Sequence, residues 1–487
     1  MSTPGVIARA LVVLSIGAVD GSLSFPSLAS RDSPLAGLDL YAPPTTSFIG
    51  PQPDDPNRTR SGPIVLFGGD LCEPATTRAA DAIILVTTEA VSRAACSYEA
   101  WYLSLYVTGA AAVLLPEVDY LPSLNMYSND GSRGAHTRHL PMLFLNIGPS
   151  GVLYDALVSD APGRNATVRP DVNVWRSALA SWYYQLFVRI LPSVVLIVSG
   201  MTAAVFLVVH MRIIDGEHMS DAHTVRQRSL PRRASFIWKA LGLPHAVLAI
   251  EVATSTLSGA VLAIGGFYST PNLPYPVLQY FTTSLGGWSL SASLLSASAW
   301  IRHLPVVVDA SLATRLIRGD RPVAFALLLT VPVAIDTAGS VLFALYNSNQ
   351  VVPTVVSALG FVFQLTFSLH VLVSVMHYYR TARRVRLQAT RAAGDQDDGM
   401  GPVLTRLSRC VLGMSLSMIL ICVGAALVVA SSAHLYRPSQ WTICWTLVYN
   451  GRALDSAFRV AMFKPRPTSA RLSTVAPALA VRVTSKK

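Results

Sequence analysis

The chain has 487 residues, of which 52% are hydrophobic and 13% are charged, and its mean hydropathy is +0.45. This composition excludes an intrinsically disordered chain, which needs low hydrophobicity and a high charge density. It also excludes a string of soluble domains, because the apolar residues gather in runs as long as a membrane span. The net charge of +11 does not indicate a nucleic-acid partner, since the basic residues lie between these runs and form no basic face with interleaved aromatic residues.

Residues 1–22 have the pattern of a secretory signal peptide. Arg9 precedes an apolar stretch from Ala10 to Val19, and small and turn-forming residues follow it. The stretch is too short to cross a bilayer, which favours cleavage over the alternative of a retained signal anchor. The sequence therefore predicts that the segment after it is exported.

Residues 25–180 alternate between short apolar runs and helix-forming stretches, which is typical of an α/β domain. Two acceptor tripeptides for N-glycosylation fall in this segment, at Asn57 and Asn165. Gly109 is expected to end a helix. We expect strands at 64–67, 82–86, 110–115 and 140–146, and helices at 97–108 and 150–158.

Cys72 and Cys96 are the two cysteines of the exported segment. An oxidising compartment and a count of two favour one disulfide between them over two free thiols. The remaining cysteines lie in apolar runs, where we interpret them as small apolar residues; they are Cys410, Cys422 and Cys444.

Seven apolar runs follow and predict a bundle of seven transmembrane helices over residues 190–463. Each run has about the 20 residues that cross a hydrocarbon core. Helices are expected because lipid offers no hydrogen-bond partner to an open backbone. The third run is rich in serine and the seventh contains Arg and Asp, so these two are the least apolar. The expected spans are 190–211, 244–267, 277–300, 322–346, 353–379, 407–431 and 441–463.

The distribution of basic residues predicts the orientation of the bundle. The loops after the first, third and fifth runs, together with the tail 464–487, contain 22 Lys and Arg residues, whereas the alternate loops contain only Arg437. Basic loops mark the cytosolic side of a membrane. We therefore expect the tail in the cytosol and the segment 25–180 outside the cell or in the lumen of an internal membrane system.

Four ionisable residues lie within the expected spans and are candidate functional groups: Glu251, Asp336, His370 and Asp455. A charge inside a membrane is costly, so each should be neutral or face a partner in the bundle interior. Asp455 has arginines at i−3 and i+4, which predicts either a local ion pair or a contact between helices. Asp336 has no Lys or Arg in its own span. We expect it to be either a pocket group or a carboxyl group hydrogen-bonded to serines of the third span.

The segment from about residue 60 to 160 resembles the protease-associated domain. The resemblance rests on segments 71–74, 95–98, 109–115 and 140–145, which read Leu-Cys-Glu-Pro, Ala-Cys-Ser-Tyr, Gly-Ala-Ala-Ala-Val-Leu-Leu and Leu-Pro-Met-Leu-Phe-Leu. It implies an α/β module without catalytic residues that covers a site or binds a ligand or a protein.

Chemistry for catalysis is not indicated, and we expect neither an enzyme nor a cofactor or metal ion. Protease-associated domains also precede intramembrane aspartyl proteases, but Asp336 and Asp455 do not stand in the Tyr-Asp and Gly-x-Gly-Asp motifs of those enzymes. The tail after Phe463 contains no Cys or His, which excludes the zinc domain of a membrane ubiquitin ligase.

The order of exported domain, seven spans and basic inner loops resembles the receptor-type heptahelical architecture. Spans two to five are also similar to the plant tobamovirus-multiplication family at 259–262, 266–269 and Trp300. We expect a receptor-like protein whose exported domain binds a ligand or protein and whose inner loops contact a cytosolic effector. The alternatives are a membrane scaffold or cargo-sorting protein, and a transporter that uses Asp336 and Glu251. Membrane lipids are expected partners of the bundle in each case.

Overall fold

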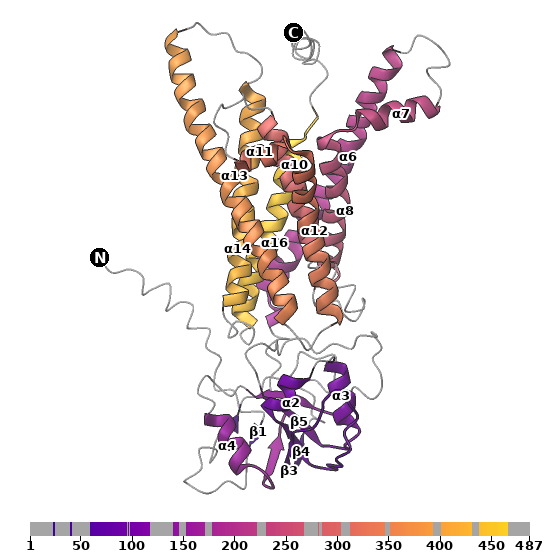
Figure 1. Ribbon diagram of the computed structural model, residues 1–487, viewed down its shortest axis with the longest axis vertical. Coiled ribbons are helices and arrows are strands. Elements are labelled where there is room, and N and C mark those ends of the chain that lie inside the picture. The colour runs from indigo at the N-terminus through magenta and orange to yellow at the C-terminus, as the bar shows by residue number, and fades with distance from the viewer. Residues whose placement is uncertain are drawn as a thin grey trace, which may run out of the picture.

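A computed structural model shows an α/β region at one end of a bundle of long helices (Figure 1). The predictions for the signal peptide 1–22, for Asn57 and for most of the tail fall outside the described residues. The structure describes residues 23–24, 39–40, 59–94, 96, 98–116, 140–145, 152–170, 178–221, 230–266, 281, 285–302, 312–345, 351–392, 401–430 and 438–465.

The α/β region is built on a sheet of seven strands in the order β2-β1-β7-β3-β4-β5-β6. Four strands run parallel to one another at the predicted positions, and the last of them forms one edge of the sheet. They are β3 (Arg60–Phe67), β4 (Ile83–Val86), β5 (Ala112–Pro116) and β6 (Met142–Leu145). Three short strands that the sequence did not predict extend the sheet in antiparallel pairing: β1 (Leu23–Ser24), β2 (Asp39–Leu40) and β7 (Asn165–Val168).

Helices cover both faces of this sheet. On one face α2 (Thr88–Arg93) and α3 (Tyr98–Tyr106) bury Val91, Trp101 and Tyr102 against the strands. On the other face α4 (Val152–Asp160) buries Leu157. Gly109 ends the turn after α3 with φ +71°, a conformation that glycine adopts without strain. The predicted helix stop and the predicted α/β domain are therefore confirmed, and the structure adds that helices lie on both faces of the sheet.

Every predicted span coincides with a long helix. In chain order the bundle contains a short π-helix η3 (Tyr184–Ile190) that continues into α6 (Leu191–Asp221), then α8 (Leu243–Ala263), α10 (Leu285–Arg302), α12 (Pro322–Leu345), α13 (Val351–Ala392), α14 (Gly401–Ala430) and α16 (Pro438–Met462). Two short helices, α7 (Leu230–Ala240) and α11 (Leu312–Arg318), lie at the end of the bundle away from the α/β region (Figure 1).

Five of these helices are long and apolar enough to cross a membrane, namely η3 with α6, α8, α12, α13 and α14. The helices α10 and α16 are less hydrophobic than these five, and they are the helices predicted to be least apolar. The reason lies in their surroundings. α10 contacts α8, α12, α13, α14 and α16, and each of its residues from Ser289 to Ile301 is buried. A helix that touches other helices on all sides has no need of a lipid-compatible surface.

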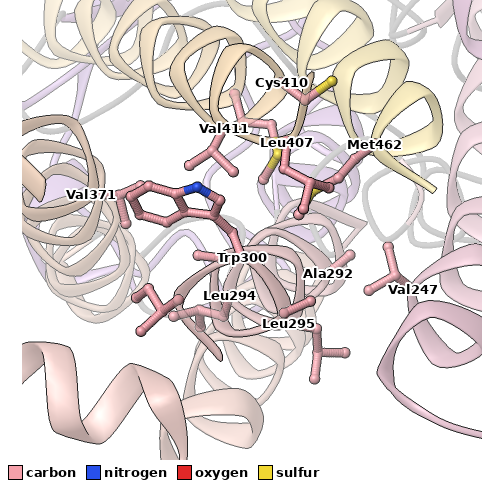
Figure 2. Packing of buried hydrophobic residues seen from close by; sticks show 14 of the residues in the cluster. Val247, Ala292, Leu294, Leu295, Trp300, Val371, Leu407, Cys410, Val411 and Met462 are labelled. Atoms are coloured by element: carbon pink, nitrogen blue, oxygen red, sulfur yellow. The ribbon is translucent and has the colours of Figure 1, made fainter. Parts of the chain in front are cut away.

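An apolar cluster in the bundle surrounds Trp300. Trp300 of α10 lies among Val371, Leu407 and Val411 from α13 and α14, as Figure 2 shows. Its indole N–H donates a 3.1 Å hydrogen bond to Ser408 Oγ. This packing fixes α10 between the outer helices and so positions the polar side chains on its other turns.

Candidate functional site

Arg459 of α16 joins three helices at the buried polar layer. Its side chain is only 1% exposed, and it forms ion pairs with Glu251 of α8 and with Asp455 of its own helix. The pair with Asp455 at i+4 is the local pair that the sequence predicted. The pair with Glu251 was not predicted. It links α16 to α8, so Arg459 forms contacts between helices as well as within its own helix.

Serine side chains satisfy the remaining hydrogen-bonding groups of this cluster. Arg459 donates to Ser289 O at 2.9 Å, to Ser289 Oγ at 2.8 Å and to Ser293 Oγ at 2.7 Å. Glu251 Oε2 accepts from Ser255 at 2.7 Å and from Ser456 at 2.6 Å. We call these seven residues the Arg459 cluster: Glu251, Ser255, Ser289, Ser293, Asp455, Ser456 and Arg459.

The Arg459 cluster holds two carboxylates against one guanidinium. Arg452 lies two helical turns from Arg459 on the same face of α16, is 9% exposed, and interacts electrostatically with Asp336 and with Glu251 of the cluster. Its Nη2 atom is buried and has no hydrogen-bond partner among the described residues. A second cation beside the cluster offsets the negative charge that burial penalises.

Asp336 of α12 lies where α12 packs closely against α10 and α13, and it interacts electrostatically with Arg452. Its carboxylate is hydrogen-bonded by the backbone of Gly287 in the first turn of α10. A Cβ on Gly286 would lie 2.9 Å from Asp336 Oδ2, and one on Gly360 of α13 would lie 3.7 Å from Oδ1. The expected bond to serines of the third span stays a prediction. The hydrogen bond from Gly287 uses a backbone N–H in the first turn of a helix, which has no partner within the helix and which a carboxylate satisfies well.

His370 of α13 does not join either site. Its Nε2 atom is buried without a hydrogen-bond partner among the described residues, and its backbone oxygen accepts from Ser374 at 2.9 Å. Of the four predicted membrane groups, the structure brings together Glu251 and Asp455. In the part of the chain that the structure describes, no group of three or more His, Cys, Asp or Glu side chains is placed to hold a metal ion.

The π-helix η3, at the start of the bundle, packs against α16. Asn450 of α16 donates a 2.7 Å hydrogen bond to the backbone oxygen of Phe187 in η3. Tyr184 of η3 stacks on Trp441, with ring centroids 6.1 Å apart. Trp445 then stacks on Tyr449 further along α16. An aromatic column thus runs along α16 from η3 toward Arg452.

Two predicted sites of the α/β region lie among the described residues. Cys72 and Cys96 form a disulfide with a Cα–Cα distance of 5.6 Å, which confirms the predicted pair. The other three cysteines are free and buried, as expected. Asn165 begins β7 and is exposed, pairing with Pro63 of β3 in the register of the sheet. Its glycosylation stays a prediction.

Comparison with known proteins identifies no relative. No family model, no curated protein and no solved structure matches this chain.

Sequence reasoning missed the serines of the Arg459 cluster and the role of Glu251 in it. One available signal was the spacing of Arg452, Asp455 and Arg459, which places three charges on one face of a helix. Such a face in an apolar helix requires polar partners from neighbouring helices. The regular serines of α10 were the natural partners, since its run contains Ser289, Ser291, Ser293, Ser296 and Ser298.

Proposed function

We propose that this protein is a receptor-like membrane protein with seven transmembrane helices and an exported, protease-associated-like α/β domain. The domain binds a ligand or protein outside the cytosol, and the bundle passes its state to the basic inner loops and a cytosolic effector. The five apolar helices, the disulfide of the α/β region and the exposed acceptor Asn165 support this assignment.

The proposed orientation has a structural argument besides the loop composition. α7 and α11 lie at the end of the bundle opposite the α/β region (Figure 1). These helices carry basic residues of the inner loops, among them Arg233, Lys239 and Arg315. One end of the bundle thus carries the α/β region with its disulfide, and the other end carries basic residues. This agrees with the proposed orientation, in which the α/β region is exported and the basic loops are cytosolic.

One observation carries the proposed signalling role: α16 contacts η3, which follows the α/β region in the chain, and also carries Asp455, Ser456 and Arg459 of the Arg459 cluster. Asn450 binds η3, and Arg459 lies nine residues further along the same helix, about 14 Å away. A movement of η3 against α16 would therefore change the geometry of a dry ion-pair cluster. Because buried ion pairs tolerate few alternative geometries, such a cluster can separate two discrete arrangements of the helices.

The test uses the full-length protein with a conformational reporter at the end of the bundle away from the α/β region. Arg315→Cys places a single reactive thiol on α11, where it can carry an environment-sensitive dye, since the native free cysteines are buried. Nanobodies against the α/β region are added to the protein in nanodiscs. We expect at least one of them to shift the dye emission, and Asn450→Leu to reduce that shift while nanobody binding is kept.

A scaffold protein behaves differently in this experiment. If every binder leaves the emission at Arg315→Cys unchanged while a dye placed on the α/β region reports binding, the helices only anchor the domain. That result would reject the receptor-like role.

A further inference from the structure

A cavity of about 760 Å³ opens on the side of the bundle between α8 and α12, with α10 as its floor. Ser291 and Leu295 of α10 form the floor and are 5% and 7% exposed. Trp288 and Val341 stand at the rim and are 38% and 47% exposed. A buried floor with an exposed rim makes this a groove that opens sideways, away from the bundle axis.

The groove opens toward the surface that lipid would cover. α12 contributes most of its wall, and the apolar window of this helix, within Pro322–Leu342, is only 22% buried by the rest of the protein. Helix residues exposed at that hydropathy contact acyl chains in a bilayer. The groove is therefore reached from the membrane and not from water.

Small residues create the hollow. Ala334 and Ala338 lie one turn apart on the exposed face of α12 and both line the groove. Opposite them, Ser291 Oγ donates a 2.6 Å hydrogen bond to Leu329 O, which holds the floor helix close to α12. The hydroxyl of Thr330 is likewise used within α12, at 3.1 Å from Ala326 O.

Two polar groups of the groove remain available to a ligand. The indole N–H of Trp288 and the hydroxyl of Thr337 make no hydrogen bond to another described residue, and both side chains line the groove. They lie on the side of the groove nearer to the α/β region, because α10 starts and α12 ends at that end of the bundle (Figure 1). Apolar side chains complete the lining of the groove, among them Leu329, Leu295 and Ile250.

We propose that this groove binds a sterol that enters laterally from the membrane. Its hydroxyl group faces Thr337 and Trp288, and its ring system covers Ala334 and Ala338. The volume lies within the range of about 300–1,000 Å³ that small-molecule sites occupy, and an apolar wall with few polar groups is their usual lining. A rigid ring system also loses little conformational entropy in a shallow groove.

The uncharged lining favours a sterol over lipids whose charged headgroup would enter the groove. None of the residues that line the groove is Lys, Arg, Asp or Glu. A phosphate or carboxylate headgroup would lie at membrane depth without a cation, which is unfavourable. A neutral ligand with one hydroxyl group leaves no such charge unpaired.

The test uses the full-length protein in phosphatidylcholine nanodiscs with a photoreactive cholesterol. After irradiation, we expect mass spectrometry to find the label on peptides of α10 and α12. Excess cholesterol should compete, and its 3α-hydroxy epimer should compete less. Ala334→Leu combined with Ala338→Leu fills the groove and should reduce the labelling at least tenfold. Ala326→Leu is the matched control, because it adds the same side chain to an exposed alanine of the same helix outside the groove.

A second variant tests the hydroxyl contact without changing the volume. Thr337→Val removes one hydrogen bond and should weaken cholesterol competition about fivefold. The proposal is overturned if the groove-filling variant is labelled as strongly as the wild type. It is also overturned if a photoreactive fatty acid labels the same peptides equally well, because the groove then accepts any acyl chain.

Discussion

Removing the positive charge of Arg459 should destabilise the bundle more than removing any exposed arginine. Arg459→Met keeps a long unbranched side chain but deletes the ion pairs to Glu251 and Asp455. It also deletes the hydrogen bonds to Ser289 and Ser293. Two carboxylates then face each other in a dry interior.

The magnitude follows from the burial of the partners. Glu251 and Asp455 are 0% and 2% exposed, so water cannot replace the lost guanidinium. Breaking a buried pair by removing one partner costs about 3–5 kcal/mol. At about 2–4 °C for each kcal/mol, this corresponds to a fall in Tm of roughly 10 °C.

The assay can use the buried native thiols. Cys410, Cys422 and Cys444 are free and buried in α14 and α16, so a thiol-reactive dye becomes fluorescent when the bundle unfolds. Arg315→Met is the matched control, because this arginine is exposed on α11. The reasoning is refuted if Arg459→Met and Arg315→Met melt at the same temperature.

A double-mutant cycle separates pairing from packing. Glu251→Gln removes one of the two carboxylates that Arg459→Met leaves unpaired. The double variant should therefore be more stable than the sum of the single effects predicts, by about 1–3 kcal/mol. Additive effects would show that the two side chains stabilise the bundle independently.

Three further predictions concern other parts of the chain. Gly287→Ala places a Cβ 2.4 Å from the carbonyl oxygen of Pro332 and should lower Tm, whereas Gly216→Ala meets no atom within 4 Å and should leave it unchanged or higher. Reduction of Cys72–Cys96, which closes a loop with a sequence separation of 24, should cost about 3 kcal/mol and speed proteolysis of the α/β region; equal digestion with and without reductant would contradict this. Asn165→Gln should remove a glycosidase-sensitive gel shift, and an unshifted wild-type band after expression in a eukaryotic cell would argue against an exported domain.

The sequence predicted the helices and the central strands well because both leave a simple pattern. Apolar runs longer than a span mark helices wherever lipid is the neighbour, and short apolar runs between turns mark buried parallel strands. The strands β1, β2 and β7 were missed because each is only two to four residues long and pairs with distant segments. Local pattern contains no information about such pairing.

The candidate site was predicted only in part, for a related reason. The membrane positions of Glu251 and Asp455, and the pair between Asp455 and Arg459 at i+4, could each be predicted from the sequence of a single helix. The contact between α8 and α16 depends on which faces of two helices meet, and the spacing of neither helix specifies that. Asp336 is a clear example: it accepts a hydrogen bond from the backbone of Gly287 in α10, which no side-chain pattern could reveal.

The helices of the bundle differ in whether they expose apolar surface or carry buried polar groups. The five helices with the most apolar windows include those that expose the most surface, whereas α10 and α16 carry the serines and arginines of the buried layer. Of these two, α16 also binds η3 through Asn450 and Tyr184 through Trp441. We propose that α16, which contacts η3 through Asn450 and the Arg459 cluster through Arg459, couples these two parts of the bundle. A shift of α16 by a fraction of a turn would break contacts at both, and that is why Asn450 and Arg459 are the positions at which coupling should be lost first.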